Sequence, residues 1–112
     1  HILLANAVVY VQPSLTEGFG LPVLEAMAAA VPVVCSNAGA LPEIAGAAAV
    51  YFDPNSVDEI KEALGEVLSG AGLRAKLTKR GKERVKQFTW ARAAKETLKV
   101  LESAVGLSYK RR

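Results

Sequence analysis

Residues 8–35 read VVYVQPSLTEGFGLPVLEAMAAAVPVVC, and this stretch decides the fold. Its first four residues form a continuous apolar run that stops before Pro13, which is typical of a strand covered by helices on both faces. Residues 23–30 are strong helix formers, and Pro22 suits the first turn of that helix. Pro32 blocks the helix and precedes a second short apolar run. This strand–helix–strand order predicts a parallel sheet with a right-handed crossover.

Further elements are expected on both sides of this unit. They are the end of a helix at 3–7, a helical turn at 41–45, a third strand at 48–52, and three helices over about 56–69, 73–88 and 90–105. Ser56 and Glu59 have the spacing of a capping box, and Thr89 suits the cap of the last helix. The predicted fold class is therefore α/β, with a partial Rossmann-like parallel sheet of about three strands followed by C-terminal helices.

The loop between the first strand and its helix carries the candidate site. Open α/β sheets bind ligands at the carboxyl ends of their strands, where this loop lies. Gly18 and Gly20 let the main chain approach a ligand, and the N–H groups around Gly20 and Leu21 open a helix whose dipole favours a diphosphate. Glu17 and Glu25, eight residues apart, flank the glycines and can accept hydrogen bonds from hydroxyls. Ribose, diphosphate and hexose occur in this order in a nucleotide sugar.

The string PSLTEGFGLPVLEAMA at 13–28 resembles a known signature. It is similar to the Glu-x7-Glu motif of retaining glycosyltransferases with the GT-B fold, in the group 1 (family 4) enzymes that include glycogen and sucrose synthases and many mannosyltransferases. The strings at 32–44 and 51–60, PVVCSNAGALPEI and YFDPNSVDEI, match the blocks that follow. The resemblance implies that residues 1–105 are the C-terminal part of the donor-binding domain, followed by a basic tail at 106–112.

The resemblance also implies roles for individual residues. Glu17 would contact hydroxyls of the donor hexose and act in catalysis, and Glu25 would bind the diol of the nucleotide ribose. The main chain of four residues would meet the sugar and the phosphates: Gly18, Phe19, Gly20 and Leu21. The implied reaction retains the anomeric configuration. It uses a UDP-, GDP- or ADP-hexose as substrate, with no metal ion and no further cofactor.

The sequence departs from the family pattern at three positions. Ala30 stands where a glycine is common before the second strand, and Ala40 and Ala47 replace a usual glycine and aspartate. None of these positions carries the implied chemistry, so the interpretation of the loop is unchanged.

The charges are divided along the chain. Residues 1–60 hold six acidic residues and no Lys or Arg, whereas residues 61–112 hold 14 basic and five acidic residues. A departing nucleoside diphosphate needs cations for its developing charge, and residues 1–60 contain none. The resemblance places an Arg and a Lys upstream, and an acceptor-binding N-terminal domain before them. Because the chain starts at His1 and runs at once into an apolar segment, we expect a fragment without transferase activity of its own.

The basic residues of 74–86 and 110–112 are open to several interpretations. A solvated helix face is the simplest, and peripheral contact with an anionic membrane is the second. Nucleic-acid binding is disfavoured because aromatic residues are not interleaved with the basic ones. A non-catalytic module that binds a nucleotide sugar or a partner chain is the alternative to an enzyme.

Several polar and aromatic residues also have simpler structural explanations. Glu17 and Glu25 are compatible with a loop charge and a charge near a helix N-terminus. Glu43 suits the first turn of a short helix, and Ser36 a turn. Trp90 is expected to anchor the last helix by packing.

Cysteine usage and hydropathy indicate the cellular environment that we expect. Cys35 is the only cysteine, which excludes an internal disulfide, and a small buried residue at a strand end is the expected role. No apolar run reaches the ~20 residues that span a bilayer. A reducing, cytoplasmic location is the expectation.

Overall fold

The computed structural model describes residues 2–106. The elements follow one another as α1 (Ile2–Ala5), β1 (Tyr10–Gln12), α2 (Leu21–Ala28), β2 (Val33–Ser36), α3 (Leu41–Ala45), η1 (Gly46–Ala48), β3 (Ala49–Phe52), α4 (Val57–Ser69), α5 (Ala71–Val85) and α6 (Trp90–Val105). Six α-helices and three strands are thus present in the part of the chain that is described. From residue 107 on, the predicted basic tail lies outside the described residues.

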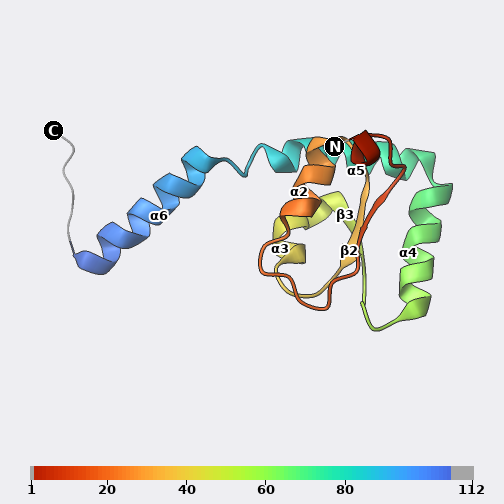
Figure 1. Cartoon of the computed structure of the whole chain (residues 1–112), viewed down its shortest axis with the longest axis horizontal. Coiled ribbons are helices and arrows are strands. Elements are labelled where there is room, and N and C mark those ends of the chain that lie inside the picture. Colours follow the sequence, from red (N-terminus) through yellow and green to blue (C-terminus); the bar gives the residue numbers. More distant parts are fainter. Residues whose placement is uncertain (1, 107–112) are drawn as a thin grey trace.

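The three strands form one parallel sheet in the order β1-β2-β3. Tyr10 pairs with Val33, and Val33 pairs with Ala49 on its other side. Helices α2 and α3 lie on one side of the sheet and α4 on the other (Figure 1). The predicted α/β fold class is confirmed.

The central strand carries the core. All four residues of β2 are buried, and their side chains alternate between a cluster under α2 and α3 and a cluster under α4 and α5. The first strand differs from its prediction. Its three residues are only half-buried, and Val8 just before it is 58% exposed. Among residues 2–106, β1 pairs only with β2, so it is an edge strand. Tyr10 packs against the cluster under α2 and α3 and Val11 against the cluster under α4 and α5, so both faces are covered as its apolar run predicts, but less deeply than in β2.

Helix α2 ends in a Schellman motif. The N–H of Val31 donates to the carbonyl of Ala26 (2.9 Å), and the N–H of Ala30 donates to that of Met27 (3.1 Å). Ala30 has φ 62°, which makes it the one non-glycine residue with a positive φ among residues 2–106. The left-handed conformation explains why a glycine is common at this position.

Helix α4 is capped by Ser56 as predicted, and α5 packs closely against α2. Ser56 Oγ accepts from the N–H of Glu59 (3.2 Å), but the carboxylate of Glu59 accepts from the N–H of Asp53 (2.8 Å) rather than from Ser56. On α5, Leu77 and Gly81 are buried. A Cβ at Gly81 would lie 3.1 Å from Cγ of Met27, so this glycine lets α5 approach α2 closely.

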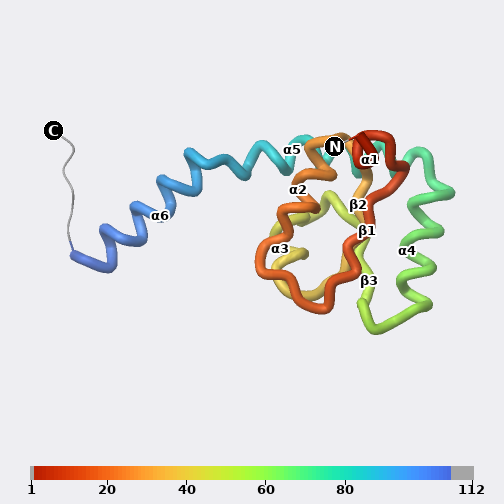
Figure 2. Tube along the Cα trace, viewed as in Figure 1, coloured from red at the N-terminus to blue at the C-terminus, as the bar shows by residue number. Residues whose placement is uncertain are grey.

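Helix α6 extends away from the rest of the molecule (Figures 1 and 2). Thr89 caps it by accepting from the N–H of Arg92 (3.1 Å), as predicted. None of its residues is buried, and Trp90 is 90% exposed. The prediction that Trp90 anchors this helix is wrong, because residues 2–106 contain no surface that covers its ring. No helix in residues 2–106 has both the length and the hydropathy to cross a membrane.

Candidate functional site

Two loops lie side by side at the carboxyl edge of the sheet (Figure 2). One connects β1 to α2, and the other connects β2 to α3. The buried Ser36 donates its hydroxyl hydrogen to the carbonyl of Ser14 (2.6 Å), and the N–H of Ala40 donates to the carbonyl of Glu17 (3.1 Å). The second loop therefore fixes the main chain of the loop that carries the predicted site residues.

The contact between the loops depends on Gly39. This residue has φ 60°, and a Cβ on it would lie 2.7 Å from the carbonyl oxygen and 2.9 Å from the nitrogen of Glu17. Both distances are shorter than a Cβ tolerates, so a side chain at this position would push the two loops apart. The approach of Gly39 to Glu17 was not predicted.

The carboxylate of Glu17 is held by side chains from the end of β1. Oε2 accepts from Nε2 of Gln12 (3.3 Å) and from the hydroxyl of Ser14 (3.2 Å). Gln12 also donates to Ser14 Oγ (2.7 Å) and accepts from the hydroxyl of Tyr10. These three residues were not predicted as part of the site. They form a polar network that orients a half-buried carboxylate toward the strand end.

The pKa of Tyr10 depends on both predicted acidic residues. Burial is the main cause that raises the pKa of Tyr10, and the negative charges of Glu17 and then Glu25 raise it further. Both carboxylates thus lie within electrostatic range of one phenol, although eight residues separate them in the sequence. Glu25 is exposed on α2, and its carboxylate accepts no hydrogen bond from residues 2–106.

The bend between Glu17 and α2 contains one exposed and one buried glycine. Gly20 is buried with φ 99°, and a Cβ on it would lie 2.8 Å from Cδ2 of Leu41. Gly18 faces open space. Within residues 2–106, the N–H groups of Gly20 and Leu21 donate no hydrogen bond, and no side chain caps α2. The N-terminus of α2 therefore presents free donors and the positive end of its dipole.

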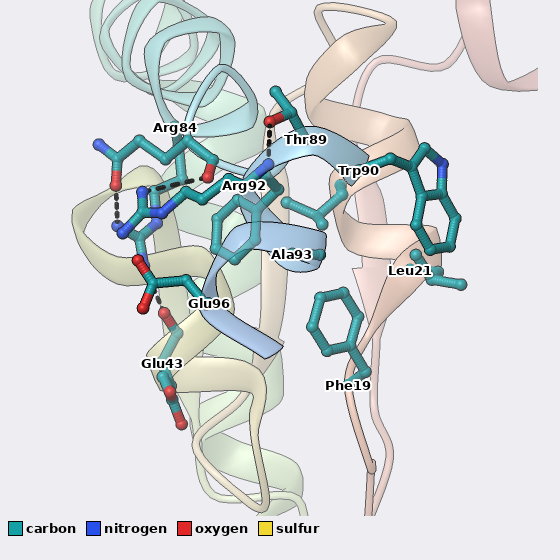
Figure 3. Close-up of a pocket in the computed structure, with 12 residues that line it drawn as sticks. Phe19, Leu21, Glu43, Arg84, Thr89, Trp90, Arg92, Ala93 and Glu96 are labelled. Carbon is teal, nitrogen blue, oxygen red and sulfur yellow. Dashed lines mark hydrogen bonds between the residues drawn. The ribbon is translucent and has the colours of Figure 1, made fainter. Parts of the chain in front are cut away.

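A cavity of about 650 Å³ lies next to this bend (Figure 3). Its walls come from the loop, from α2 and α3, from the end of α5 and its connection to α6, and from the start of α6. The lining residues are Phe19, Leu21, Leu24, Glu43, Arg84, Gln87, Phe88, Thr89, Trp90, Arg92, Ala93 and Glu96. Neither Glu17 nor Glu25 lines it. The structure thus separates the two carboxylates from the side chains of Phe19 and Leu21, which turn toward this cavity.

The sequence of this chain matches a known family. Residues 1–84 match the family model described as Glycosyl transferases group 1. The chain belongs to this family. It is 46% identical over 96 residues to O-antigen chain mannosyltransferase B from Escherichia coli, which covers 86% of the chain and 25% of that protein.

Solved structures support the same assignment for this group 1 glycosyltransferase chain. Sucrose-phosphate synthase from Thermosynechococcus elongatus aligns with a TM-score of 0.76 and 29% identity, over 94% of the chain and 27% of that structure. The C-terminal domain of a group 1 family protein from Francisella tularensis aligns with a TM-score of 0.67 and 34% identity, over 76% of the chain and 45% of that structure. The fold is that of a GT-B C-terminal domain. The chain spans about a quarter of the length of the curated relatives that it matches.

Arg84 comes from the basic helix α5 of this glycosyltransferase chain and lines the cavity, and main-chain carbonyls already bind its guanidinium. Arg84 donates from Nε to the carbonyl of Ile44 (2.8 Å), from Nη2 to the carbonyl of Glu43, and from Nη1 to Oε1 of Gln87 (2.8 Å). Glu43 lies in the first turn of α3, as predicted. Arg84 was not predicted to have a special role, because nothing in its sequence neighbourhood distinguishes it from the other basic residues of α5.

Proposed function

We propose that this chain forms the donor-binding part of a retaining glycosyltransferase that transfers a hexosyl group from a nucleotide sugar. One observation carries the proposal. The half-buried carboxylate of Glu17 is held by Gln12 and Ser14 directly before a glycine bend whose Gly20 and Leu21 N–H groups donate no hydrogen bond within residues 2–106. The alternative explanation, two unrelated surface charges, does not account for the network that holds Glu17.

Each part of a nucleotide sugar has a chemical counterpart around the bend. The diphosphate accepts hydrogen bonds from the free N–H groups of Gly20 and Leu21, where the dipole of α2 favours negative charge. The carboxylate of Glu25 accepts from the ribose diol, and that of Glu17 accepts from hydroxyls of the hexose. Gln12 and Ser14 keep Glu17 in one orientation, which lowers the entropy lost when a sugar binds.

The leaving nucleoside diphosphate needs cations that the loop does not supply. Residues 1–60 contain no Lys or Arg, and the guanidinium of Arg84 is bound to the carbonyls of α3. We propose that a preceding part of the polypeptide supplies these cations and the acceptor site. The 112 residues alone are then expected to bind a donor without transferring the sugar.

Binding can be tested on the 112-residue chain itself. UDP-glucose, GDP-mannose and ADP-glucose are titrated by calorimetry into the wild type and into Glu17→Gln and Glu25→Gln. Each substitution removes a charged acceptor, and each is expected to raise Kd about tenfold, equivalent to about 1.4 kcal/mol. Glu62→Gln on the exposed side of α4 is the matched control and leaves Kd unchanged.

Transfer can be tested in a chimera. The chain replaces the matching quarter of the Escherichia coli mannosyltransferase to which it is 46% identical. The chimera is expected to transfer mannose, and Glu17→Gln in it is expected to lower turnover at least a hundredfold while the protein stays folded. A folded chimera that binds the donor but never turns over would favour a non-catalytic binding module instead.

A further inference from the structure

The aromatic pair of Phe19 and Phe88 connects the glycine bend to the end of α5. The two rings meet edge to face, with their centroids 6.2 Å apart and their planes at 86°. Figure 3 shows the side chain of Phe19 extending from the loop into the cavity. Phe19 is 45% exposed and follows Gly18, around which the space is open. The ring of Phe88 is therefore a main support for a segment whose glycine permits many main-chain conformations.

Phe88 is itself fixed by Arg84. The guanidinium carbon lies 5.1 Å from the centroid of the Phe88 ring, in a cation–π arrangement. The N–H of Phe88 donates to the carbonyl of Val85 (2.9 Å), and the ring packs against the core cluster under α2 and α3. The hydrogen bonds of Arg84 to Ile44 and Glu43 hold the guanidinium in turn.

The guanidinium of Arg84 also binds helix α3, which supports the bend from the other side. Helix α3 begins with Leu41, whose Cδ2 would contact any side chain at Gly20, and the N–H of Ala40 just before it bonds to Glu17. The far end of this five-residue helix is where Arg84 binds. Arg84 thus joins the two structures, α3 and Phe88, between which the bend lies.

We propose that Phe88, braced by Arg84, is a positioning residue for donor binding. It sets the place of Phe19 and so of the N–H groups at Gly20 and Leu21, without touching the donor. This inference rests on the proposed function, since the donor is what the positioned main chain binds. It predicts that an aromatic residue is needed at position 88 for affinity, beyond its contribution to stability.

A double-mutant cycle on the 112-residue chain tests the proposal. Kd for UDP-glucose, GDP-mannose and ADP-glucose is measured for Phe88→Leu, Phe19→Leu and the double variant. Each single change is expected to raise Kd about three- to tenfold, and the double variant is expected to bind no worse than the weaker single one. Phe88→Tyr keeps the ring and restores wild-type affinity. Phe52→Leu, the same substitution in the opposite cluster, lowers stability but leaves Kd within about twofold.

A second readout needs no ligand. The amide resonances of Gly18 and Gly20 are expected to shift in Phe88→Leu and Arg84→Lys, and to stay in place in Phe52→Leu. Unchanged glycine resonances would overturn the positioning role. So would losses of binding free energy in the two single variants that add up in the double variant. If the wild type binds none of the three nucleotide sugars, the proposed function fails for this chain, and the glycine resonances alone then decide whether Phe88 positions the bend.

Discussion

Helices α2 and α6 have opposite environments, and α2 is apolar almost throughout whereas α6 is amphipathic. Four of the eight residues of α2 are buried, whereas none of the sixteen residues of α6 is. Yet α6 has a continuous apolar face that includes Trp90, Leu101 and Val105, with Arg92 and Lys99 on the other side. The pattern predicts a helix in both cases, but burial also needs a partner surface, and residues 2–106 supply one only to α2.

The contrast implies two sources of stability. Residues of the sheet and of α2 to α5 pack in two clusters on the two faces of the same central strand, so a change in either cluster affects the stability of the whole unit. Helix α6 depends on local terms: the Thr89 cap, helix propensity and the left-handed Gly106 at its end. Substitutions that are alike in chemistry should therefore differ in effect between the two regions.

Aromatic truncation gives the largest expected difference. Phe52→Ala leaves a cavity in the cluster under α4 and α5 and is expected to lower the free energy of unfolding by about 3–5 kcal/mol. Trp90→Ala, at a ring that is 90% exposed, is expected to change it by less than about 0.5 kcal/mol. Urea denaturation followed by circular dichroism measures both. A large loss for Trp90→Ala would show that α6 folds back onto the core.

Alkaline pH should weaken the core but not α6. Burial raises the pKa of Cys35 to about 12. Burial, and then the negative charge of a Cys35 thiolate, raise the pKa of Tyr51 to about 12, against a smaller lowering by Arg84. The unfolded chain loses these protons near their ordinary pKa values, about 8.5 and 10. It then binds fewer protons than the folded chain, so the free energy of unfolding falls as pH rises from about 9 to 12, by up to about 1.4 kcal/mol per pH unit and group.

The control for this effect is Cys35→Ala. It removes the first of the two titrations, so the decline should begin near pH 10 instead of pH 9 in urea denaturation curves collected across this range. A stability that stays level up to pH 11 in the wild type would contradict the assigned burial of both groups.

Helix caps give a smaller difference. Ser56→Ala removes the acceptor for the N–H of Glu59 and is expected to lower global stability by about 1 kcal/mol. Thr89→Ala removes the equivalent bond to Arg92 but should leave the unfolding midpoint of the core in place. Its effect should instead appear as faster amide hydrogen exchange confined to residues 90–105. Equal midpoint shifts for the two variants would mean that α6 and the core unfold as one unit.

The sequence predicted local features better than long-range ones. The order of strands and helices and the caps at Ser56 and Thr89 follow from residue types within one turn of each other, and all were confirmed. The contact between Gly39 and Glu17 was missed, because 22 residues separate them along the chain. No local pattern indicates that contact.

Burial was predicted wrongly where it depends on neighbours. An apolar run predicts a strand, but whether β1 is central or at an edge depends on which strands pair with it. Trp90 was expected to pack because large aromatic side chains usually do, and its environment is set by what lies against α6. The roles of Glu17 and Glu25 stay predictions that the proposed substitutions test.

Substitutions at the ends of the two helices should give the smallest change in the free energy of unfolding, and the sign of that change is easy to measure. Helix α6 ends at Gly106 with φ 66°, whereas α2 ends before Ala30 with φ 62°. A Cβ in this conformation destabilises the folded chain by about 1–2 kcal/mol, and glycine removes that strain. Glycine also makes the unfolded chain more flexible, which offsets about 0.4–1 kcal/mol of the gain. Ala30→Gly should therefore raise the free energy of unfolding by about 0.5–1 kcal/mol.

Ala29→Gly is the matched control for this gain. Ala29 is the neighbouring alanine, half-buried like Ala30, but its φ of −78° is one that any residue adopts. Glycine at position 29 relieves no strain and only increases the conformational entropy lost on folding. Ala29→Gly should therefore lower the free energy of unfolding by about 0.5–1 kcal/mol. Opposite signs at two adjacent alanines separate backbone strain from any general effect of glycine on this turn. If both substitutions destabilise the chain, the left-handed turn at Ala30 carries no strain to relieve, and the helix end is held by the Val31 and Ala30 hydrogen bonds alone.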